Sequence, residues 1–241
     1  MIQRITSKQN NKIKHCQKLY QPNYRDEHHQ FLIEGYHLLE MALRSNAVLE
    51  IYTTIEIKEV SNDIPQFIVD DEILRKIASS TNPQGVVAVC SYLKEEDIQG
   101  NKVLYLDHIN DPGNLGTIFR SALAFGYEDI VLSEKCCSPY NEKAIQASQG
   151  AIFELRIHHQ SIDELKEKGY QIIATEIKGS VELSSVKPDE KHVLILGNES
   201  HGVTLNNLKK ADLRVRIDIK NIESLNVGVA AGIAMYALSQ K

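Results

Sequence analysis

The part of the chain that begins at residue 102 alternates regularly between short apolar runs and amphipathic helical segments. Strands are expected at 102–107, 129–132, 153–157, 170–175, 192–196 and 213–217, and helices at 115–125, 142–148, 162–168, 205–209 and 227–238. Such alternation is typical of an α/β protein, in which helices cover both faces of a mainly parallel sheet. Ligands of open sheets of this class bind beyond the carboxyl ends of the strands. Functional residues are therefore expected in the loops that follow the strands.

Residues 1–95 are expected to form a smaller α/β domain. Ser7 is placed to cap a first helix, and Pro22 is expected to break the chain after it. The apolar residues that share one face of this helix are Ile13, Cys16, Leu19 and Tyr20. Further strands are expected at 31–33, 48–53, 67–69 and 86–89, and helices at 37–44 and 72–78. The polar, acidic stretch 94–101 is the expected linker, which divides the chain into domains 1–95 and 96–241.

The net charge of −5 is unevenly distributed along the chain. Residues 1–25 include no Asp or Glu, and their basic residues are Arg4, Lys8, Lys12, Lys14, Lys18 and Arg25. Two interpretations of this segment stay open. It is either a solvated helix face, which is usual for an isolated run of charge, or a surface that binds nucleic-acid phosphates, with Tyr20 and Tyr24 for stacking.

The cysteines and histidines indicate neither a metal site nor a disulfide framework. The four cysteines form no C-x-x-C pair, and the nine histidines include no H-E-x-x-H motif. No apolar run is long enough to span a bilayer, and no apolar signal region follows the first charged residues. A cytoplasmic protein without a metal is therefore expected.

Three polar segments follow expected strands or open expected helices. Asp111–Ala122 contains a strand exit, a Pro-Gly turn and a helix start, and Leu194–Gly202 is an apolar strand that runs into a polar loop between two glycines. Ile222–Gly232 sets Ser224 and Asn226 at the start of a helix of small residues. These two residues either face a ligand or only cap the helix. The shared position of the segments at the ends of strands favours one common site.

Taken in this order, the three segments resemble the three motifs of the SpoU (TrmH-like) branch of the SPOUT RNA methyltransferases. Residues 143–151 also resemble an element of that family, and Phe31–Gly35 and Pro83–Val89 resemble the L30e-like RNA substrate-binding domain that often precedes it. The resemblance implies an α/β fold with a C-terminal trefoil knot, a homodimer, and S-adenosylmethionine as the cofactor. It also implies 2'-O-methylation of a ribose in RNA, and the N-terminal domain favours ribosomal RNA over transfer RNA.

The family motifs, matched residue by residue, assign the reaction to a small set of side chains. The resemblance implies Arg120 as the leading catalytic residue and places in the same site Asn114, Glu199, Ser224 and Asn226. It implies a cofactor site, formed largely by backbone groups, at Thr175, Leu196, Gly197, Ile217, Leu225 and Asn226. Because a guanidinium is effectively always protonated, Arg120 is expected to clamp a phosphate and stabilise the 2'-oxygen rather than act as a base. The alternative is an arginine that only pairs with a surface carboxylate, and Glu199 is expected to hold Arg120 or Asn226 in place.

The sequence departs from the family pattern in two places. Ile217-Asp218-Ile219 stands where Ile-Pro-Met is usual, so a carboxylate replaces the proline that stiffens the loop. Gln146 and Gln149 stand where Arg and Met are common, which removes one phosphate contact. Asp218 is the best support for the alternative function, an RNA-binding protein that keeps the fold without turnover. A nucleotide-dependent oxidoreductase is disfavoured because no G-x-G-x-x-G motif is present.

Overall fold

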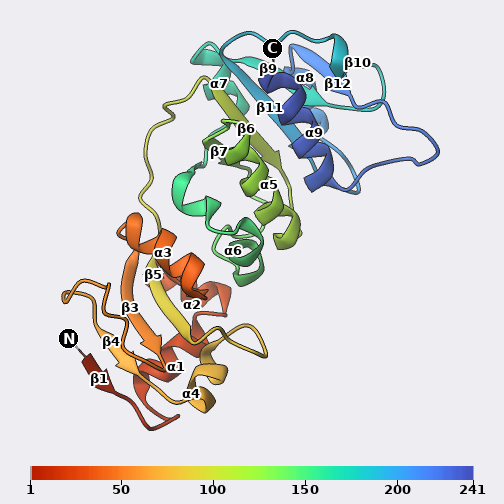
Figure 1. Ribbon diagram of the computed structural model, residues 1–241. Helices are drawn as coiled ribbons and strands as arrows, with labels where there is room; N and C mark the ends of the chain where they lie inside the picture. The colour runs from red at the N-terminus through yellow and green to blue at the C-terminus, as the bar shows by residue number, and fades with distance from the viewer. Residues whose placement is uncertain (1, 241) are drawn as a thin grey trace. The chain divides into compact units, whose positions relative to one another are not determined.

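The computed structural model describes residues 2–240, which divide into two compact units (Figure 1). The first unit contains the residues up to Lys94 together with Tyr140–Phe153, and the second contains Glu95–Pro139 together with the residues from Glu154 onward. The first division falls within the stretch where the sequence places the linker. The sequence assigns residues 140–153 to the second domain, whereas in the structure they pack within the first unit.

Aromatic packing holds the segment Tyr140–Phe153 within the first unit. The ring of Tyr140 stacks on that of Tyr92, with centroids 3.8 Å apart, and lies 4.9 Å from the ring of Phe31. The ring of Phe153 lies 6.2 Å from the same Phe31 ring, which is fully buried. Apolar aromatic surface of this size is strongly stabilised by burial, so these contacts explain the assignment of the segment.

Within the described residues, the first unit is built on a five-stranded mixed sheet. Its spatial order is β1 (Ile2–Arg4), β4 (Gln66–Ile68), β3 (Val48–Thr53), β5 (Val86–Ser91) and β2 (Gln30–Glu34). Strand β4 pairs in parallel with β1 and β3, whereas β5 pairs antiparallel with β3 and β2. The helices are α1 (Asn11–Lys18), α2 (Pro22–His28), α3 (Tyr36–Arg44), α4 (Asp71–Ile77) and α6 (Glu142–Ser148).

One local prediction for this unit is wrong, and two of its elements were not predicted. The first helix ends at Lys18, before Pro22, as expected, but Pro22 begins the unpredicted helix α2, because the first residue of a helix makes no intrahelical use of the N–H that proline lacks. Strand β1 was not predicted, since it is only three residues long. Helix α1 is capped by Asn10 rather than Ser7. Its apolar face is confirmed, because Ile13 and Cys16 are fully buried in the core of the unit.

In the structure, some of the basic side chains of residues 1–25 are buried or form ion pairs. Arg25 is only 2% exposed, and its guanidinium donates a hydrogen bond to a backbone carbonyl 3.2 Å away. Lys8 and Lys12 form ion pairs with glutamates of the same unit. The exposed basic residues of the segment that have no such partner are Arg4, Lys14 and Lys18. Fewer side chains can therefore attract phosphates than the sequence suggests.

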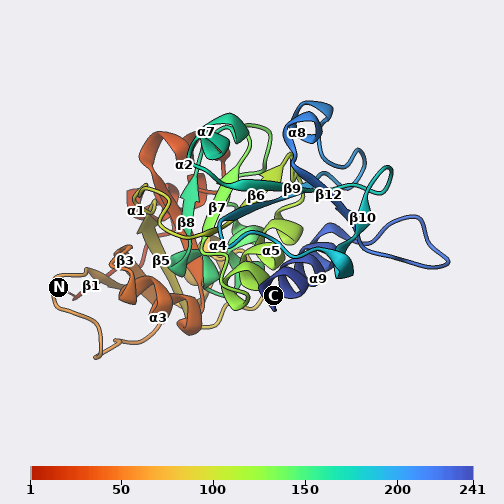
Figure 2. The ribbon, with the colours of Figure 1, turned by 90° about the horizontal axis from the view of Figure 1, so that it is seen from above.

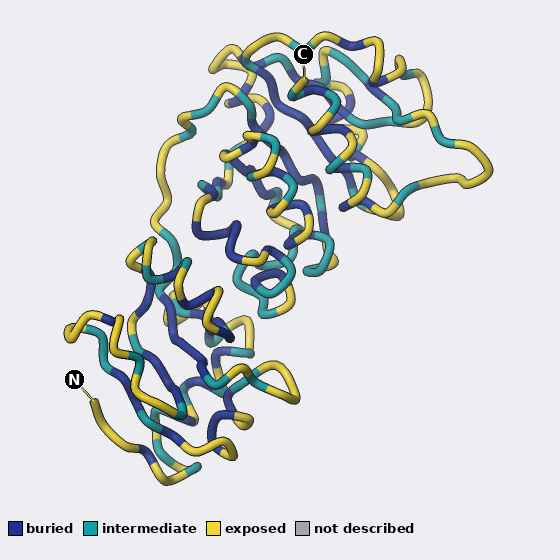
Figure 3. The backbone as a smooth tube through the Cα atoms, viewed as in Figure 1, coloured by how far each residue is buried: buried dark blue, intermediate teal, exposed yellow. Residues whose placement is uncertain are grey.

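Within the described residues, the second unit is built on a seven-stranded sheet whose pairings are all parallel (Figures 1 and 2). The sequence predicted a mainly parallel sheet with six of these strands, and β10 was not predicted. The spatial order is β10 (Val181–Glu182), β12 (Leu213–Arg216), β9 (Gln171–Thr175), β11 (His192–Gly197), β6 (Lys102–Asp107), β7 (Asp129–Leu132) and β8 (Arg156–His158). Its helices are α5 (Pro112–Ala124), α7 (Ile162–Glu167), α8 (Leu205–Lys210) and α9 (Val227–Ser239). The central strands β6 and β11 are buried along almost their whole length (Figure 3), as expected for parallel strands covered on both faces.

Helices α5 and α9 lie side by side because small residues let their backbones approach (Figures 1 and 2). A Cβ atom added at Gly228 would lie 3.2 Å from Cγ2 of Thr117, and one added at Gly232 would lie 3.6 Å from Oγ of Ser121. This packing fixes the start of α9 against the start of α5. Among residues 2–240, no helix has the length and apolar character needed to cross a bilayer.

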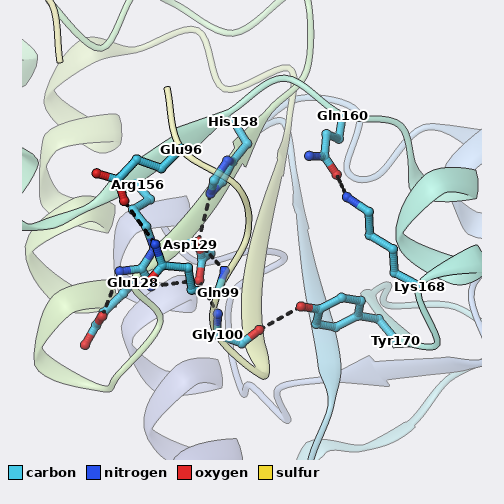
Figure 4. Close-up of polar contacts among 10 residues, drawn as sticks. All are labelled: Glu96, Gln99, Gly100, Glu128, Asp129, Arg156, His158, Gln160, Lys168 and Tyr170. Carbon is cyan, nitrogen blue, oxygen red and sulfur yellow. Dashed lines mark hydrogen bonds and ion pairs between the residues drawn. The ribbon is translucent and has the colours of Figure 1, made fainter. Parts of the chain in front are cut away.

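A buried carboxylate closes the amino-terminal edge of the second sheet (Figure 4). Asp129, the first residue of β7, is fully buried and accepts two hydrogen bonds from Arg156, both at 2.9 Å, one from His158 at 2.8 Å and one from the Gly100 N–H at 2.7 Å. Burial alone would raise the pKa of Asp129, but these donors outweigh it and hold the pKa well below its usual range. The network stabilises the edge opposite to the carboxyl ends of the strands.

Candidate active site

The carboxyl ends of four parallel strands meet at one edge of the second sheet. The register aligns Gly197, the last residue of β11, with Asp107, the last residue of β6. On the other side of β11, β9 ends at Thr175, which is paired with Val215 of β12. Polar loops continue from each of these ends, so this edge gathers segments that are far apart in the sequence.

A cleft of about 620 Å³ opens at this edge, within the size range of small-molecule sites. Its walls are residues 175–178, 196–203, 215–217, 219 and 223–225, together with Leu183, Leu208 and part of α9. The expected cofactor residues that line it are Thr175, Leu196, Gly197, Ile217 and Leu225. The side chains of Glu199 and Ser224 line it as well, whereas those of Asn114, Arg120 and Asn226 do not. The structure thus brings most of the expected residues to one concave surface.

The backbone of residues 197–203 folds back on itself beside the cleft. The Asn198 N–H donates to the Gly202 carbonyl at 3.1 Å, and the Gly202 N–H donates back to the Asn198 carbonyl at 2.8 Å. A Cβ atom at Gly197 would lie only 2.0 Å from the carbonyl carbon of Gly202 and from the nitrogen of Val203. Gly202 itself has a φ of +67°, a conformation that side chains disfavour. The two glycines therefore have different roles. Gly197 lets the backbone of residues 202–203 approach closely, and Gly202 allows the turn.

A chain of hydrogen bonds joins three of the expected catalytic residues. Asn114 donates from Nδ2 to Oε1 of Glu199 at 2.7 Å, and Asn226 donates from Nδ2 to Oδ1 of Asn114 at 2.9 Å. Oδ1 of Asn226 accepts from the N–H groups of Gly228 and Val229 at the start of α9. Since backbone N–H groups only donate, they orient the Asn226 amide, which in turn orients Asn114 towards the carboxylate. Asn226 thus caps α9, which is one of the two interpretations left open by the sequence, and its amide also contacts Asn114. That it faces a ligand stays a prediction.

Glu199 therefore holds Asn226 only indirectly, through Asn114, and it does not contact Arg120. Arg120 is exposed on α5, and among residues 2–240 no carboxylate lies within 4.0 Å of it and no hydrogen-bond partner is present. The alternative role of Arg120, an ion pair with a surface carboxylate, is therefore not observed among residues 2–240. Ser224 is exposed in the loop before α9 and lines the cleft.

The sequence did not single out Asn198, which ties two of the strand ends together. Its Nδ2 donates to the backbone carbonyl of His108 at 2.9 Å, and its Oδ1 accepts from the Ser200 N–H at 2.8 Å. His108 follows the end of β6 and has a φ of +62°, so Asn198 stabilises an unusual backbone turn. The signal in the sequence was the position of an asparagine directly after the strand glycine.

Asp218, the departure from the family pattern, is paired with a neighbour. Its Oδ1 accepts a hydrogen bond from Nε of Arg216 at 2.9 Å, and Arg216 also donates to the backbone carbonyl of Ser180. Arg216 thereby connects the start of the loop to the segment before β10. The carboxylate at position 218 is therefore compensated by a guanidinium instead of standing alone beside the cleft.

The described part of the chain, residues 2–240, contains no group of three or more His, Cys, Asp or Glu side chains that could hold a metal ion.

Comparison with known protein families identifies the family to which the chain belongs. A family model described as the SpoU rRNA Methylase family matches residues 101–236, and one described as the MRM3-like substrate binding domain matches residues 10–88. The chain belongs to the SpoU rRNA methylase family. This SpoU protein is 32% identical over 246 residues to the 23S rRNA (guanosine(2553)-2'-O)-methyltransferase RlmP of Bacillus subtilis, and the match covers 98% of this chain and 99% of that protein.

Solved structures agree with this assignment over both units. An rRNA methyltransferase from Sinorhizobium meliloti superposes with a TM-score of 0.90 at 28% identity, covering 99% of this chain and 98% of that one. An AdoMet-bound structure of an rRNA methyltransferase from the same organism also gives a TM-score of 0.90, at 26% identity and with the same coverage. The α/β fold of the SpoU family, with its smaller N-terminal unit, therefore extends over nearly the whole chain.

Proposed function

We propose that this SpoU protein transfers the methyl group of S-adenosylmethionine to a ribose 2'-hydroxyl of ribosomal RNA. The observation that carries the proposal is the cleft around which five expected cofactor residues meet, joined through Glu199 to the hydrogen bonds of Asn114 and Asn226. The name of the Bacillus relative gives a guanosine of 23S rRNA as its target. A target in the large-subunit RNA is therefore the first to be tested for this chain.

The cleft fits S-adenosylmethionine by shape and by chemistry. Its apolar walls, to which Leu196, Val203 and Leu208 contribute, suit an adenine ring, and the folded-back loop beside them offers backbone polar groups. The carboxylates of Glu176, Glu199 and Glu223 outnumber the cations of Lys178 and Arg216 in its lining, and this excess of negative charge favours the cationic sulfonium and ammonium groups. When bound, the cofactor supplies an activated methyl group, so no metal is needed for the transfer.

The residues of the chain would act mainly by alignment, which can supply several kcal/mol of a barrier, about 7–11 at best. The bonds from Glu199 through Asn114 to Asn226 fix the loop of β11, the start of α5 and the start of α9 relative to one another. Arg120, exposed and without a partner in residues 2–240, is available to an RNA phosphate and to negative charge that develops on the 2'-oxygen. Its permanent charge suits stabilisation rather than proton removal.

The proposal includes a homodimer, the trefoil knot and a cytoplasmic location. Support for the dimer comes from α9, where Val229, Ile233 and Tyr236 are 52%, 40% and 55% exposed at helical spacing. Such an apolar stripe is typical of an interface. Light scattering of the purified protein tests the dimer, and a monomer at micromolar concentration would contradict it.

The proposed activity is tested by mapping 2'-O-methyl groups in ribosomal RNA from cells with and without this protein. A single modified ribose should be lost with the gene and restored by the purified protein with S-adenosylmethionine in vitro. Identical maps, together with binding of RNA but no transfer in vitro, would favour the RNA-binding protein without turnover. Addition of a chelator to the reaction should leave the rate unchanged.

The role of Arg120 is tested by Arg120→Ala. Transfer in a single turnover should be abolished, whereas S-adenosylmethionine affinity measured by calorimetry should be retained, because Arg120 does not line the cleft. Arg120→Lys should recover little, since an ammonium cannot reproduce bidentate geometry. Arg44→Ala, at an exposed arginine of α3, is the matched control. A near-normal rate in the Ala variant would remove Arg120 from the mechanism.

A further inference from the structure

The first unit contains a large cleft of its own, about 820 Å³ in volume. Its walls are the end of α1 with Tyr20, the start of α3 after Gly35, the loop 78–84 and one side of α6. Helix α6 lies outside the stretch matched by the substrate-binding domain model, residues 10–88, yet belongs to the same compact unit. The cleft is thus completed by a segment contributed from the second half of the chain.

Five amide side chains line this cleft, and most of them have free hydrogen-bonding capacity. The amides that line it are Gln17, Asn82, Gln84, Gln146 and Gln149. Those of Asn82 and Gln84 have no hydrogen-bond partner among residues 2–240. Gln146 donates to the backbone carbonyl of Glu34 at a long 3.4 Å, and its amide oxygen accepts nothing from the described residues. An amide presents both a donor and an acceptor in one plane, which matches the edge of a nucleobase.

A glycine gives one of these amides its position. Gly35 has a φ of +97°, and a Cβ atom there would lie 2.8 Å from Oε1 of Gln84. The Gln84 amide therefore rests against the backbone at the start of α3, where any larger residue would displace it. This glycine explains how a side chain from the loop 78–84 reaches over the helix start.

The charge of the cleft is balanced, which argues against a phosphate as its occupant. Lys76 and Lys143 contribute two positive charges, and Glu34 and Glu142 contribute two negative ones. Glu34 is also saturated, because its oxygens accept hydrogen bonds from the backbone and hydroxyl groups of the loop at residues 79–80. A neutral, polar and planar group suits such a site better than an anion.

A fixed aromatic ring completes the site. The hydroxyl of Tyr20 donates to the backbone carbonyl of Ile77 at 2.8 Å, and the half-buried ring packs against the core of the unit. A ring held in this way at the wall of a cleft offers a surface on which a base can stack, and stacking is worth about 1–3 kcal/mol per base. Lys76 and Lys143 are exposed, so their ammonium groups can reach phosphates outside the cleft.

We propose that this cleft binds one unstacked base of a single-stranded RNA segment. Gln84 and Gln146 read the edge of the base, Tyr20 supports its face, and Lys76 and Lys143 contact the phosphates of the neighbouring nucleotides. The inference rests on the proposed function only in taking RNA as the substrate. It places a base-reading site in the first unit, separate from the methyl-transfer cleft of the second.

The test compares the affinity of the full-length protein for a fluorescent 12-nucleotide single strand with that for the same strand paired to its complement. The wild type should prefer the single strand by about tenfold or more, because bases in a duplex cannot enter the cleft. The double variant Gln84→Ala/Gln146→Ala should lose this preference while keeping its affinity for the duplex. Its salt dependence should not change, since no charge is removed. Lys143→Ala should instead lower the salt slope by about 0.7.

Gln9→Ala and Lys58→Ala, at exposed positions of the same unit away from the cleft, are the matched controls and should resemble the wild type. A wild type without preference for the single strand, or a double variant that retains the preference, would overturn the inference. A change in salt slope in the double variant would also overturn it, because it would indicate phosphate contacts. S-adenosylmethionine affinity and methyl transfer to ribosomal RNA, measured in parallel on the wild type, report separately on the proposed activity.

Discussion

Replacement of Gly197 by alanine tests whether the folded-back loop forms part of the cofactor site. The added Cβ atom would lie 2.0 Å from two backbone atoms of residues 202–203, whereas ordinary contact begins at 3.4 Å. Backbone atoms cannot rotate away as a side chain can, so the loop must shift by about 1 Å or more. In a preorganised site a displacement of this size lowers the reaction rate on the order of 100-fold. The same overlap should lower the free energy of unfolding by about 1–3 kcal/mol. We therefore expect S-adenosylmethionine binding to be lost while the protein remains folded.

Calorimetry gives the affinity and urea unfolding gives the stability of the same samples. Gly232→Ala is the matched control, because its Cβ atom would meet only Oγ of Ser121 at 3.6 Å and the residue lies within α9. That variant should be as stable as the wild type or more so, since alanine favours a helix by about 1 kcal/mol over glycine. If Gly197→Ala binds S-adenosylmethionine like the wild type, the reasoning that places the cofactor against this loop is refuted.

Two further predictions concern the hydrogen-bond networks of the second unit. Asn226→Asp should keep its helix cap and its stability in urea, but it should slow methyl transfer, because a carboxylate cannot donate a hydrogen bond to Asn114. Asn226→Ala should slow methyl transfer and also lose about 1 kcal/mol of stability, because the cap is removed. Asp129→Asn should cost about 3–5 kcal/mol at pH 7, since Arg156 and His158 would lose a buried partner. The folded-state pKa of Asp129 is lowered, so its stabilisation is complete above the unfolded value of about 4 and is lost progressively as the pH falls from there towards the folded-state pKa. Urea titrations from pH 7 to pH 3 should show the start of this loss in the wild type and not in the variant.

The sequence predicted the parts of the fold that depend on local periodicity. The continuous apolar runs of β6 and β11 predicted a buried parallel sheet, and the spacing of Ile13 and Cys16 predicted the buried face of α1. The family motifs also pointed to several residues that line the cleft of the second unit, but Asn114, Arg120 and Asn226 lie outside its lining. For the strands and for α1, the signal lies within a few neighbouring residues, where the apolar pattern decides which side is buried. The site residues followed from the family resemblance instead.

The features that the sequence could not predict depend on contacts between distant residues. Docking of 140–153 relies on Phe31 and Tyr92, which lie 48 or more positions away, and the hydrogen bond from Asn198 to the end of β6 spans 90 positions. Burial of Arg25 likewise removes a charge that the sequence presents as exposed. Such contacts are set by the tertiary fold, which a local pattern of charge or hydrophobicity does not contain.

The aromatic packing of Tyr140–Phe153 into the first unit has a consequence for the order in which the protein is made. When the first 94 residues have emerged from the ribosome, every described strand of that unit has been made. Helix α6 and the rings of Tyr140 and Phe153, which pack against Phe31, have not. The unit can reach its final state only after Phe153 has emerged, by which time β6, α5 and β7 of the second unit have been made as well. Domains generally fold as units during synthesis, N-terminal first. Here the first unit cannot finish folding before residues 140–153 have been made. A gene fragment that ends at Lys94 would therefore encode a domain with an exposed aromatic face. Because the unit consists of two separate stretches of the chain, the two units cannot be exchanged between proteins by a single splice.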